Sequence, residues 1–234
     1  MKINIHAGHN PDGMVACGAI GLIKESTANR EVCAEVIRQL QILGHITYDC
    51  TVNDGTSVSN VLTKIVTKCN TNTVDLDVSI HFNAFDGSAK GTEVLVYSTT
   101  SASNSYASGI VTEIASLGFT NRGVKTRTDL YVLKNTNAPA LLVECCFVDS
   151  VEDISQYDYK VMASAIVKGI TGEVVEDIME TNNKNLVETE TNIDNSTIQT
   201  LYRVQVGAYS NKSNAQGMVE NLQEAGYDAF ITQA

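Results

Sequence analysis

Tryptophan is absent from the 234-residue sequence, and aromatic residues together make up only 6% of it. A carbohydrate site built on stacked indole rings is therefore not expected. Basic residues are also scarce, because 16 lysines and arginines stand against 27 aspartates and glutamates, a formal charge of −11 at pH 7. Nucleic-acid binding relies on clustered cations that neutralise phosphates, so this charge argues against a nucleic-acid partner.

Long apolar runs are missing as well. The sequence has no stretch of about 18 or more apolar residues, so no membrane insertion is expected. The first residues show no basic segment followed by an apolar one, so we expect no signal peptide and synthesis in a cytoplasm. The hydrophobic fraction of 43% is nevertheless sufficient for a globular core.

The six cysteines form no Cys-x-x-Cys pair and share no short ligand-type spacing with a histidine. They are scattered through apolar stretches, where reduced thiols behave as small hydrophobic side chains. A structural zinc site built on cysteine is therefore not predicted. The residues are Cys17, Cys33, Cys50, Cys69, Cys145 and Cys146.

Residues 1–172 alternate between strand-like and helix-like patterns. Helical spacing of apolar residues predicts helices over 29–43, 57–69, 103–117 and 156–170, and Gly44 is predicted to end the first of them. Short apolar or alternating runs predict strands over 2–7, 46–52, 76–83, 91–99, 130–135 and 140–148. This order predicts an α/β fold, a three-layer sandwich whose mainly parallel central sheet is flanked by helices.

The composition changes after Gly172. Residues 173–200 are rich in Glu, Asp, Asn and Thr and poor in large apolar side chains, which predicts an acidic, flexible linker. Residues 201–234 predict a strand, a helix over 213–225 and a second strand, which make a small C-terminal βαβ unit. A unit of 34 residues is too small to bury a sufficient core alone.

Several predicted strands end in groups that bind metals or move protons. His6 and His9 come at the end of the first strand, His81 near the end of strand 76–83, and Glu144 within strand 140–148. In an open, mainly parallel sheet, ligands collect at the carboxyl ends of the strands. We therefore expect these four side chains to converge although they are far apart in the sequence.

Imidazole and carboxylate ligands together suit zinc, and catalytic zinc sites typically combine three protein ligands with water. His9 and His81 supply two ligands. Glu25, at the mouth of the first helix, is well placed as the third, and Asp12 is an alternative because it shares the loop with His9. Two further glutamates of that helix are expected to face solvent: Glu31 and Glu35.

In order and spacing, the chain resembles the zinc-dependent N-acetylmuramoyl-L-alanine amidases of the amidase-3 family over four segments: AGHN, KESTANREVCAEVIRQLQILGH, SIHFNA and PALLVECCFVDS. Two other segments are similar to that family's later strands, GTEVLVYS and NRGVKTRTDLYVLKNTNAPALLVE. The resemblance covers roughly residues 1–172. One departure is Asn10, which stands where the family usually has a second glycine after the Gly-His pair.

The resemblance implies that His9, Glu25 and His81 bind zinc and that Glu144 is the catalytic residue. It also implies the substrate, which is the amide bond between N-acetylmuramic acid and L-alanine in peptidoglycan. Zinc would polarise the carbonyl and activate water. Glu144 would accept the proton of the water and pass it to the departing nitrogen.

Other polar residues are expected to support this site. Asn83, in the His-x-Asn-Ala pattern, is expected to orient its loop, and His6 to support the site from within its strand rather than bind zinc. Lys125 and Arg127 either contact carboxylates of the peptide stem or lie in a solvated loop, and the second interpretation is favoured. Glu93 is expected to have a cross-strand or surface role.

Residues 201–234 resemble one half of a SPOR domain, through YRVQVGAYSNKSNAQGMVENLQEAGYDAFI. Whole members of that family contain two such halves and bind glycan strands stripped of peptide. The half unit is therefore expected to bind the wall, to pair with its copy in a second chain to form a homodimer, or to stay partly disordered.

The sequence thus predicts a zinc amidase that lyses peptidoglycan. The lack of a signal peptide favours a phage endolysin, which waits in the host cytoplasm until a holin opens the membrane, over a bacterial autolysin. The alternatives are a zinc peptidase or other amide hydrolase on the same fold, and a non-catalytic wall-binding protein.

Overall fold

The computed structural model of the chain describes residues 1–175 together with Gln216 and Val219. Within residues 1–175 the strands are β1 (Lys2–Ala7), β2 (Ile46–Asp49), β3 (Leu76–Asn83), β4 (Thr92–Val96), β5 (Asn121–Thr126) and β6 (Ala140–Phe147). The helices are α1 (Glu25–Ile42), α2 (Val58–Asn70), α3 (Ser103–Ser116), α4 (Tyr131–Asn135), α5 (Val151–Gln156) and α6 (Tyr159–Thr171). Most of the predicted linker 173–200 and of the predicted unit 201–234 lies outside the described residues.

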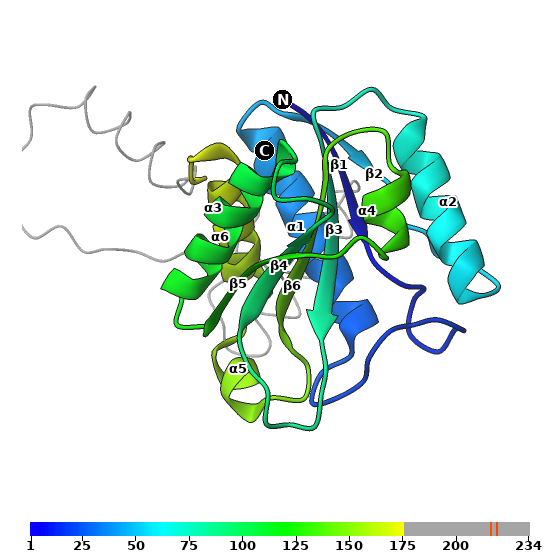
Figure 1. Ribbon diagram of the computed structural model, residues 1–234. Coiled ribbons are helices and arrows are strands. Elements are labelled where there is room, and N and C mark those ends of the chain that lie inside the picture. Colours follow the sequence, from blue (N-terminus) through cyan, green and yellow to red (C-terminus); the bar gives the residue numbers. More distant parts are fainter. Residues whose placement is uncertain (176–215, 217–218, 220–234) are drawn as a thin grey trace, which may run out of the picture. The chain divides into compact units, whose positions relative to one another are not determined.

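The strands form one sheet in the order β2-β1-β3-β6-β4-β5 (Figure 1). Strands β2, β1, β3 and β6 are parallel, whereas β4 pairs with β6 in the antiparallel sense and with β5 in parallel. The mainly parallel sheet predicted from the sequence is therefore confirmed. Its two outer strands on one side, β4 and β5, run in the opposite direction to the rest.

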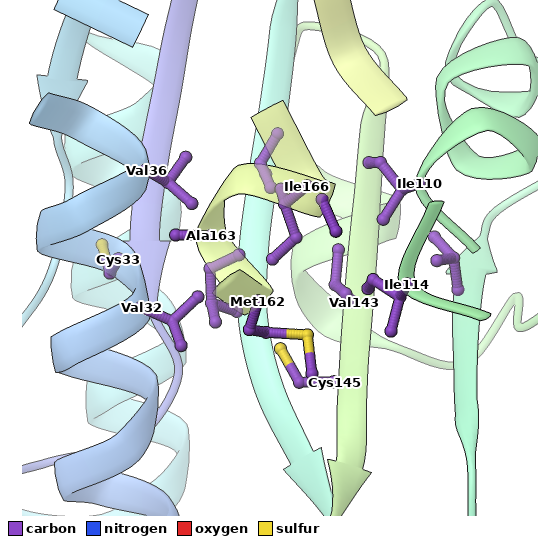
Figure 2. Close-up of a cluster of buried hydrophobic side chains, with 14 of the residues drawn as sticks. Val32, Cys33, Val36, Ile110, Ile114, Val143, Cys145, Met162, Ala163 and Ile166 are labelled. Carbon is purple, nitrogen blue, oxygen red and sulfur yellow. The ribbon is translucent and has the colours of Figure 1, made fainter. Parts of the chain in front are cut away.

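Helices cover both faces of the sheet, which confirms the three-layer sandwich. Helices α1, α3 and α6 pack on one face, where Ile110 and Ile166 are completely buried between helix and sheet (Figure 2). Replacing a side chain such as Ile166 with Ala in a core of this kind costs about 2–5 kcal/mol. Residues from three helices and from β6 meet there: Val32, Cys33, Val36, Ile110, Ile114, Val143, Cys145, Met162, Ala163 and Ile166.

The opposite face is apolar over only part of its length. Leu142 of β6 and Leu95 of β4 lie in a second core cluster with residues of α2 and α4. Two positions along each strand, on the same face because side chains alternate, the apolar residues give way to Glu144 and Glu93. Polar side chains therefore begin where the α2–α4 layer stops.

The predicted strand 130–135 is wrong, because these residues form the short helix α4. The strand that follows α3 is instead β5, a polar edge strand whose sequence, NRGVKT, carries little apolar signal. The chain must then pass over β4 to reach β6, and a single helical turn that buries Val132 and Leu133 makes this connection. A short apolar run such as LYVLKN fits either a strand or one turn of helix.

Helix α1 begins four residues earlier than predicted, at Glu25, and Gly44 follows its end in the left-handed conformation expected of a helix-ending glycine. The prediction that Glu35 faces solvent is wrong. Its side chain is buried and accepts hydrogen bonds from Arg38 and Gln39, and Gln39 also donates to Ser164 of α6. Glu35 is buried because α6 packs against this side of α1. The apolar periodicity of α1 did not predict that packing.

None of the helices within the described residues is both long and apolar enough to cross a membrane.

Candidate metal centre and active site

The segment that follows β1 brings His9 to the carboxyl edge of the sheet. Gly8 lies against the imidazole of His81 so closely that a Cβ at this position would be 2.1 Å from the ring. Any side chain at position 8 would therefore force the ring of His81 to move. His9 itself has a φ of 63°, a left-handed conformation that residues with a side chain rarely adopt.

Glu25, the first residue of α1, is 3% exposed and its carboxylate is fully engaged. Its Oε2 accepts a hydrogen bond from the backbone N–H of Ala19 at 2.8 Å, and its Oε1 accepts one from the N–H of Phe82 at 3.1 Å. The same Oε1 lies 3.0 Å from Nδ1 of His81 and 3.2 Å from Nε2 of His9. Two imidazoles from distant segments therefore converge on one carboxylate.

His9, Glu25 and His81 each offer one ligand atom, and these atoms lie within 4.8 Å of one another. Within the part of the chain that the structure describes, this is the one such group of three or more histidine, cysteine or acidic residues. The imidazole rings of His9 and His81 meet nearly edge to face, with their planes 79° apart. Two imidazole nitrogens and one carboxylate oxygen are a donor set that suits a catalytic zinc ion, so the residues fit that metal.

The charges of this cluster are arranged to keep Glu25 ionised. Burial alone would raise the pKa of Glu25, but hydrogen bonds with His81 and His9 outweigh it and hold the pKa well below its usual value. Burial lowers the pKa of His81, and Glu25 opposes part of that effect. An ionised carboxylate and a neutral imidazole are the forms in which these groups bind a metal.

Glu144 lies on β6 beside this cluster. Its backbone is in register with His81 on β3 and with Glu93 on β4, so the three side chains form a row on one face of the sheet. Burial, followed by the negative charges of Glu25 and Glu93, raises the pKa of Glu144 to about 8, and Arg127 opposes the shift. Its buried Oε2 atom has no hydrogen-bond partner.

Glu93 sits on the other side of Glu144 and is 7% exposed. Its Oε2 accepts hydrogen bonds from Nζ of Lys125 at 2.5 Å and from Nε of Arg122 at 2.8 Å. Burial raises the pKa of Glu93, but the hydrogen bonds from these two cations outweigh it, and the net pKa is lowered. The cross-strand role is thus observed, and Asn83 makes a long contact of 3.5 Å with the same carboxylate.

The other residues singled out from the sequence are not part of the three-residue cluster. His6 is buried within β1 with Nδ1 3.4 Å from the hydroxyl of Ser79, and burial, with a smaller effect of His81, lowers its pKa to about 3. Asp12 forms an ion pair of 2.6 Å with Lys24. Arg127 makes two hydrogen bonds with Asp129 in the loop after β5.

Asn10 and Arg30, two residues beside His9, make contacts that the sequence did not suggest. Asn10 is fully buried, and its amide group bonds to the backbones of Val15 and Gly55. The left-handed backbone falls on His9 rather than on Asn10. Arg30 donates to the carbonyl oxygen of His9. In the sequence, the only feature that drew attention to these two residues was that Asn10 departs from the family motif.

The fold and this site define a class, an α/β sandwich with a His–Glu–His cluster that has the donor set of a metal site and a half-buried glutamate at the carboxyl edge of its sheet. Comparison with known families gives a match to the N-acetylmuramoyl-L-alanine amidase family over residues 3–176 and to the SPOR domain over residues 187–234. The chain belongs to the N-acetylmuramoyl-L-alanine amidase family.

Individual relatives agree with this assignment. The chain is 30% identical to the sporulation-specific N-acetylmuramoyl-L-alanine amidase of Bacillus subtilis, over 67% of this chain and 56% of that protein. It is 31% identical to the endolysin of Bacillus phage SPP1, over 64% of this chain and 55% of that one. The catalytic domain of the CD27L endolysin, which targets Clostridia difficile, has a solved structure with a TM-score of 0.69 and 26% identity, covering 75% of this chain and 99% of that one.

The chain spans about half the length of the curated relatives it matches, 48% of one protein and 58% of another from Clostridium perfringens.

Proposed function

We propose that this protein hydrolyses the amide bond between N-acetylmuramic acid and L-alanine in peptidoglycan, with zinc held by His9, Glu25 and His81. The observation that carries the proposal is the convergence of three ligand atoms within 4.8 Å, next to the half-buried Glu144 on the neighbouring strand. Membership of the amidase family supplies the substrate class. The same donor set would also serve a zinc peptidase, so the bond cleaved has to be tested.

Zinc bound there would supply Lewis-acid chemistry, polarising the scissile carbonyl and activating water. The protein's own part in proton transfer falls to Glu144. Its Oε2 has no hydrogen-bond partner in the protein and is free to accept a proton from water and to donate it to the departing amide nitrogen. The pKa of about 8 applies without a metal, and a nearby cation favours the ionised carboxylate that a general base needs.

The decisive variant is Glu144→Gln, which keeps the size of the side chain but removes the base. We expect zinc content equal to that of the wild type and a loss of hydrolysis of about 10²–10⁴-fold. Elemental analysis gives the zinc content, and labelling of new N-termini in digested cell wall gives the bond. L-Alanine at those termini supports the amidase, and another residue points to a peptidase.

Glu152→Gln is a suitable control, because Glu152 is an exposed glutamate paired with Lys90. Its activity should stay at the wild-type level. Near-normal wall lysis by Glu144→Gln would remove Glu144 from the mechanism, and zinc-free wild-type protein with full activity would remove the metal.

We also propose that the protein acts as a phage endolysin that is made in the host cytoplasm and reaches the wall after a holin opens the membrane. Two of the relatives, from phage SPP1 and the CD27L protein, are named as endolysins. The sporulation-specific relative supports the alternative of a bacterial autolysin. Expression in a host with and without a holin tests this, because an endolysin of this kind lyses cells only when the holin is present.

For the C-terminal segment we propose binding to the wall or pairing between two chains through residues 201–234. The match to the SPOR domain supports the first of these roles, binding to the wall. Sedimentation of the full chain and of a chain ending at Gly172 separates the two. A dimer that becomes a monomer on truncation supports pairing, and monomers throughout, with weaker wall binding on truncation, support wall recognition.

A further inference from the structure

The backbone of His9 needs support from its surroundings. With a φ of 63° it occupies a region that residues with a Cβ adopt only when neighbouring structure holds them there. This conformation directs Nε2 to within 3.2 Å of Glu25. Any relaxation of the loop would therefore move one of the three candidate ligands.

Arg30 provides one part of this support from the second turn of α1. Its Nη2 donates to the carbonyl oxygen of His9 at 2.8 Å and to that of Val52 at 3.1 Å. Its Nη1 donates to the carbonyl oxygen of Ser26 at 2.9 Å, and Nη2 and Nε both donate to Oδ1 of Asn53, at 2.9 and 3.2 Å. One guanidinium thus ties the metal-binding loop to α1 and to the loop after β2.

Asn10, the residue after His9, is also anchored to the loop that follows β2. Its Nδ2 donates to the carbonyl oxygens of Val15 and Gly55, both at 2.7 Å, and its Oδ1 accepts from the N–H of Gly55 at 3.0 Å. The peptide bond between His9 and Asn10 is therefore held at two points. Arg30 binds the carbonyl oxygen of His9, and the side chain of Asn10, a fully buried residue, anchors the other end.

The acceptors of these Arg30 hydrogen bonds are carbonyl and amide oxygens, not carboxylates. These contacts therefore depend on the several N–H donors of a guanidinium and their fixed arrangement more than on its positive charge. A lysine carries the same charge but only a single donor atom at the end of a flexible chain. Arg30→Lys consequently separates the two properties.

We infer that Arg30 is a positioning residue that fixes His9 for metal binding and so sets the zinc affinity of the site. This inference rests on the proposed function, because it assumes that His9 is a zinc ligand. Residues that orient metal ligands typically change metal affinity about 10–100-fold when they are replaced. We expect a loss in this range for Arg30→Lys.

The test measures zinc affinity of the full chain by competition with a chromophoric chelator. The absorption spectrum of the Co²⁺-substituted protein provides a second signal, because it reports the arrangement of the ligands independently of activity. The thermal midpoint of the metal-free protein measures stability. Arg30→Lys should bind zinc at least tenfold more weakly and show an altered cobalt spectrum.

Arg38→Lys is the matched control on the same helix. The guanidinium of Arg38 donates two hydrogen bonds, at 2.6 and 2.8 Å, to a carboxylate, that of Glu35. This variant should keep zinc affinity within twofold of the wild type. Equal zinc affinity and an unchanged cobalt spectrum in Arg30→Lys would overturn the inference, as would an equal loss of affinity in both variants.

If Arg30→Lys does not fold, Asn53→Ala decides the question. It removes the oxygen that accepts two of the Arg30 donors and leaves Arg30 in place. A severalfold loss of zinc affinity in a folded Asn53→Ala protein supports the inference, and wild-type affinity overturns it. A wild-type chain that binds no zinc would instead overturn the proposed function itself.

Discussion

The two sides of the site contain the same kind of residue in opposite states. On the β1–α1–β3 side, Glu25 is buried among two backbone N–H donors and two imidazoles, and its pKa is lowered. On the β6–β4 side, Glu144 is half-buried and its Oε2 has no hydrogen-bond partner. Burial, followed by the charges of Glu25 and Glu93, raises its pKa to about 8. Burial raises the pKa of both carboxyl groups. The two imidazoles reverse this effect for Glu25, whereas the neighbouring carboxylates add to it for Glu144.

The largest effect is expected from Glu25→Gln, which removes the charge at the centre of the first side. An amide has only one oxygen for the donors that now share two, and it attracts a cation weakly. Zinc affinity should fall more than about 100-fold, since the variant loses a ligand and not merely a group that orients one. Equilibrium dialysis followed by elemental analysis measures this.

Glu35→Gln is the comparison for that experiment, because Glu35 is a second buried glutamate of α1 that contacts Arg38 and Gln39 rather than the histidines. It should retain zinc. Equal zinc binding by wild type and Glu25→Gln would show that the carboxylate is not a ligand.

The second prediction concerns the pH dependence of stability in the metal-free protein. A carboxyl group whose pKa is raised on folding, as that of Glu144 is, favours the folded state fully below its unfolded pKa of about 4.5, and this stabilisation is lost as the pH rises through about 8. Glu144→Gln has no such loss. Relative to wild type, the variant should gain about 1 kcal/mol or more between pH 5 and pH 8.5, since one pKa unit corresponds to about 1.4 kcal/mol.

Denaturant unfolding in the presence of a chelator, at a series of pH values, measures this gain. Glu25 has the opposite sign, because its lowered pKa gives stability that is present above its unfolded pKa and lost as the pH falls. Glu25→Gln should therefore be destabilised at pH 7 in the same assay. A pH-independent difference between Glu144→Gln and wild type would contradict the assignment of the raised pKa to Glu144.

Glu93→Gln should sharpen the second side of the comparison. The change removes a negative charge opposite Glu144 and frees Lys125 and Arg122 from their shared acceptor. Both effects favour ionised Glu144, so its pKa falls and the acidic limb of the pH–activity profile moves to lower pH. At a pH on that limb, the variant should retain a severalfold larger fraction of its maximal activity than the wild type does.

The profile of kcat/KM against pH gives this shift, and Glu113→Gln is the control because Glu113 pairs with Lys168 between α3 and α6. The control should leave the profile in place. A shift of the acidic limb to higher pH in Glu93→Gln would refute the electrostatic role of Glu93.

The smallest effect is expected for Lys125→Met. The Lys125 side chain is 44% exposed, and ion pairs at such positions contribute about 0–1 kcal/mol to stability. Lys90→Met is the comparison, since Lys90 is 43% exposed and is also paired with a glutamate, although that glutamate, Glu152, is exposed. Both should shift the free energy of unfolding by less than about 1 kcal/mol. A tenfold rise of KM for wall fragments in Lys125→Met alone would indicate contact with a carboxylate of the peptide stem.

The sequence predicted much of the fold because most of its elements carry strong periodic patterns. Strands 76–83 and 140–148 and the helix over 103–117 appear close to their predicted limits as β3, β6 and α3. The errors fall where the pattern is short or polar. Residues 130–135 fit a strand and a helical turn equally well, and the polar strand β5 gave little apolar signal.

The sequence also predicted part of the candidate site, because several of its residues follow strands with a clear apolar pattern. His9, His81 and Glu144 were found because each stands at or near the carboxyl end of an apolar strand, where a parallel sheet gathers its ligands. The contacts of Arg30, and the two cations that pair with Glu93, could not be found in this way. They depend on which strands are neighbours and on how three loops meet, and neither is encoded in local spacing.

The sequence by itself thus determined which chemical groups this protein has at the ends of its strands. The tertiary structure decided their states. It placed Glu25 where two imidazoles and two N–H groups meet, and Glu144 between two other carboxylates. Electrostatic interactions depend on distance and burial, which only the packed sheet and its loops establish, so two glutamates of equal chemistry in the chain become different in the fold.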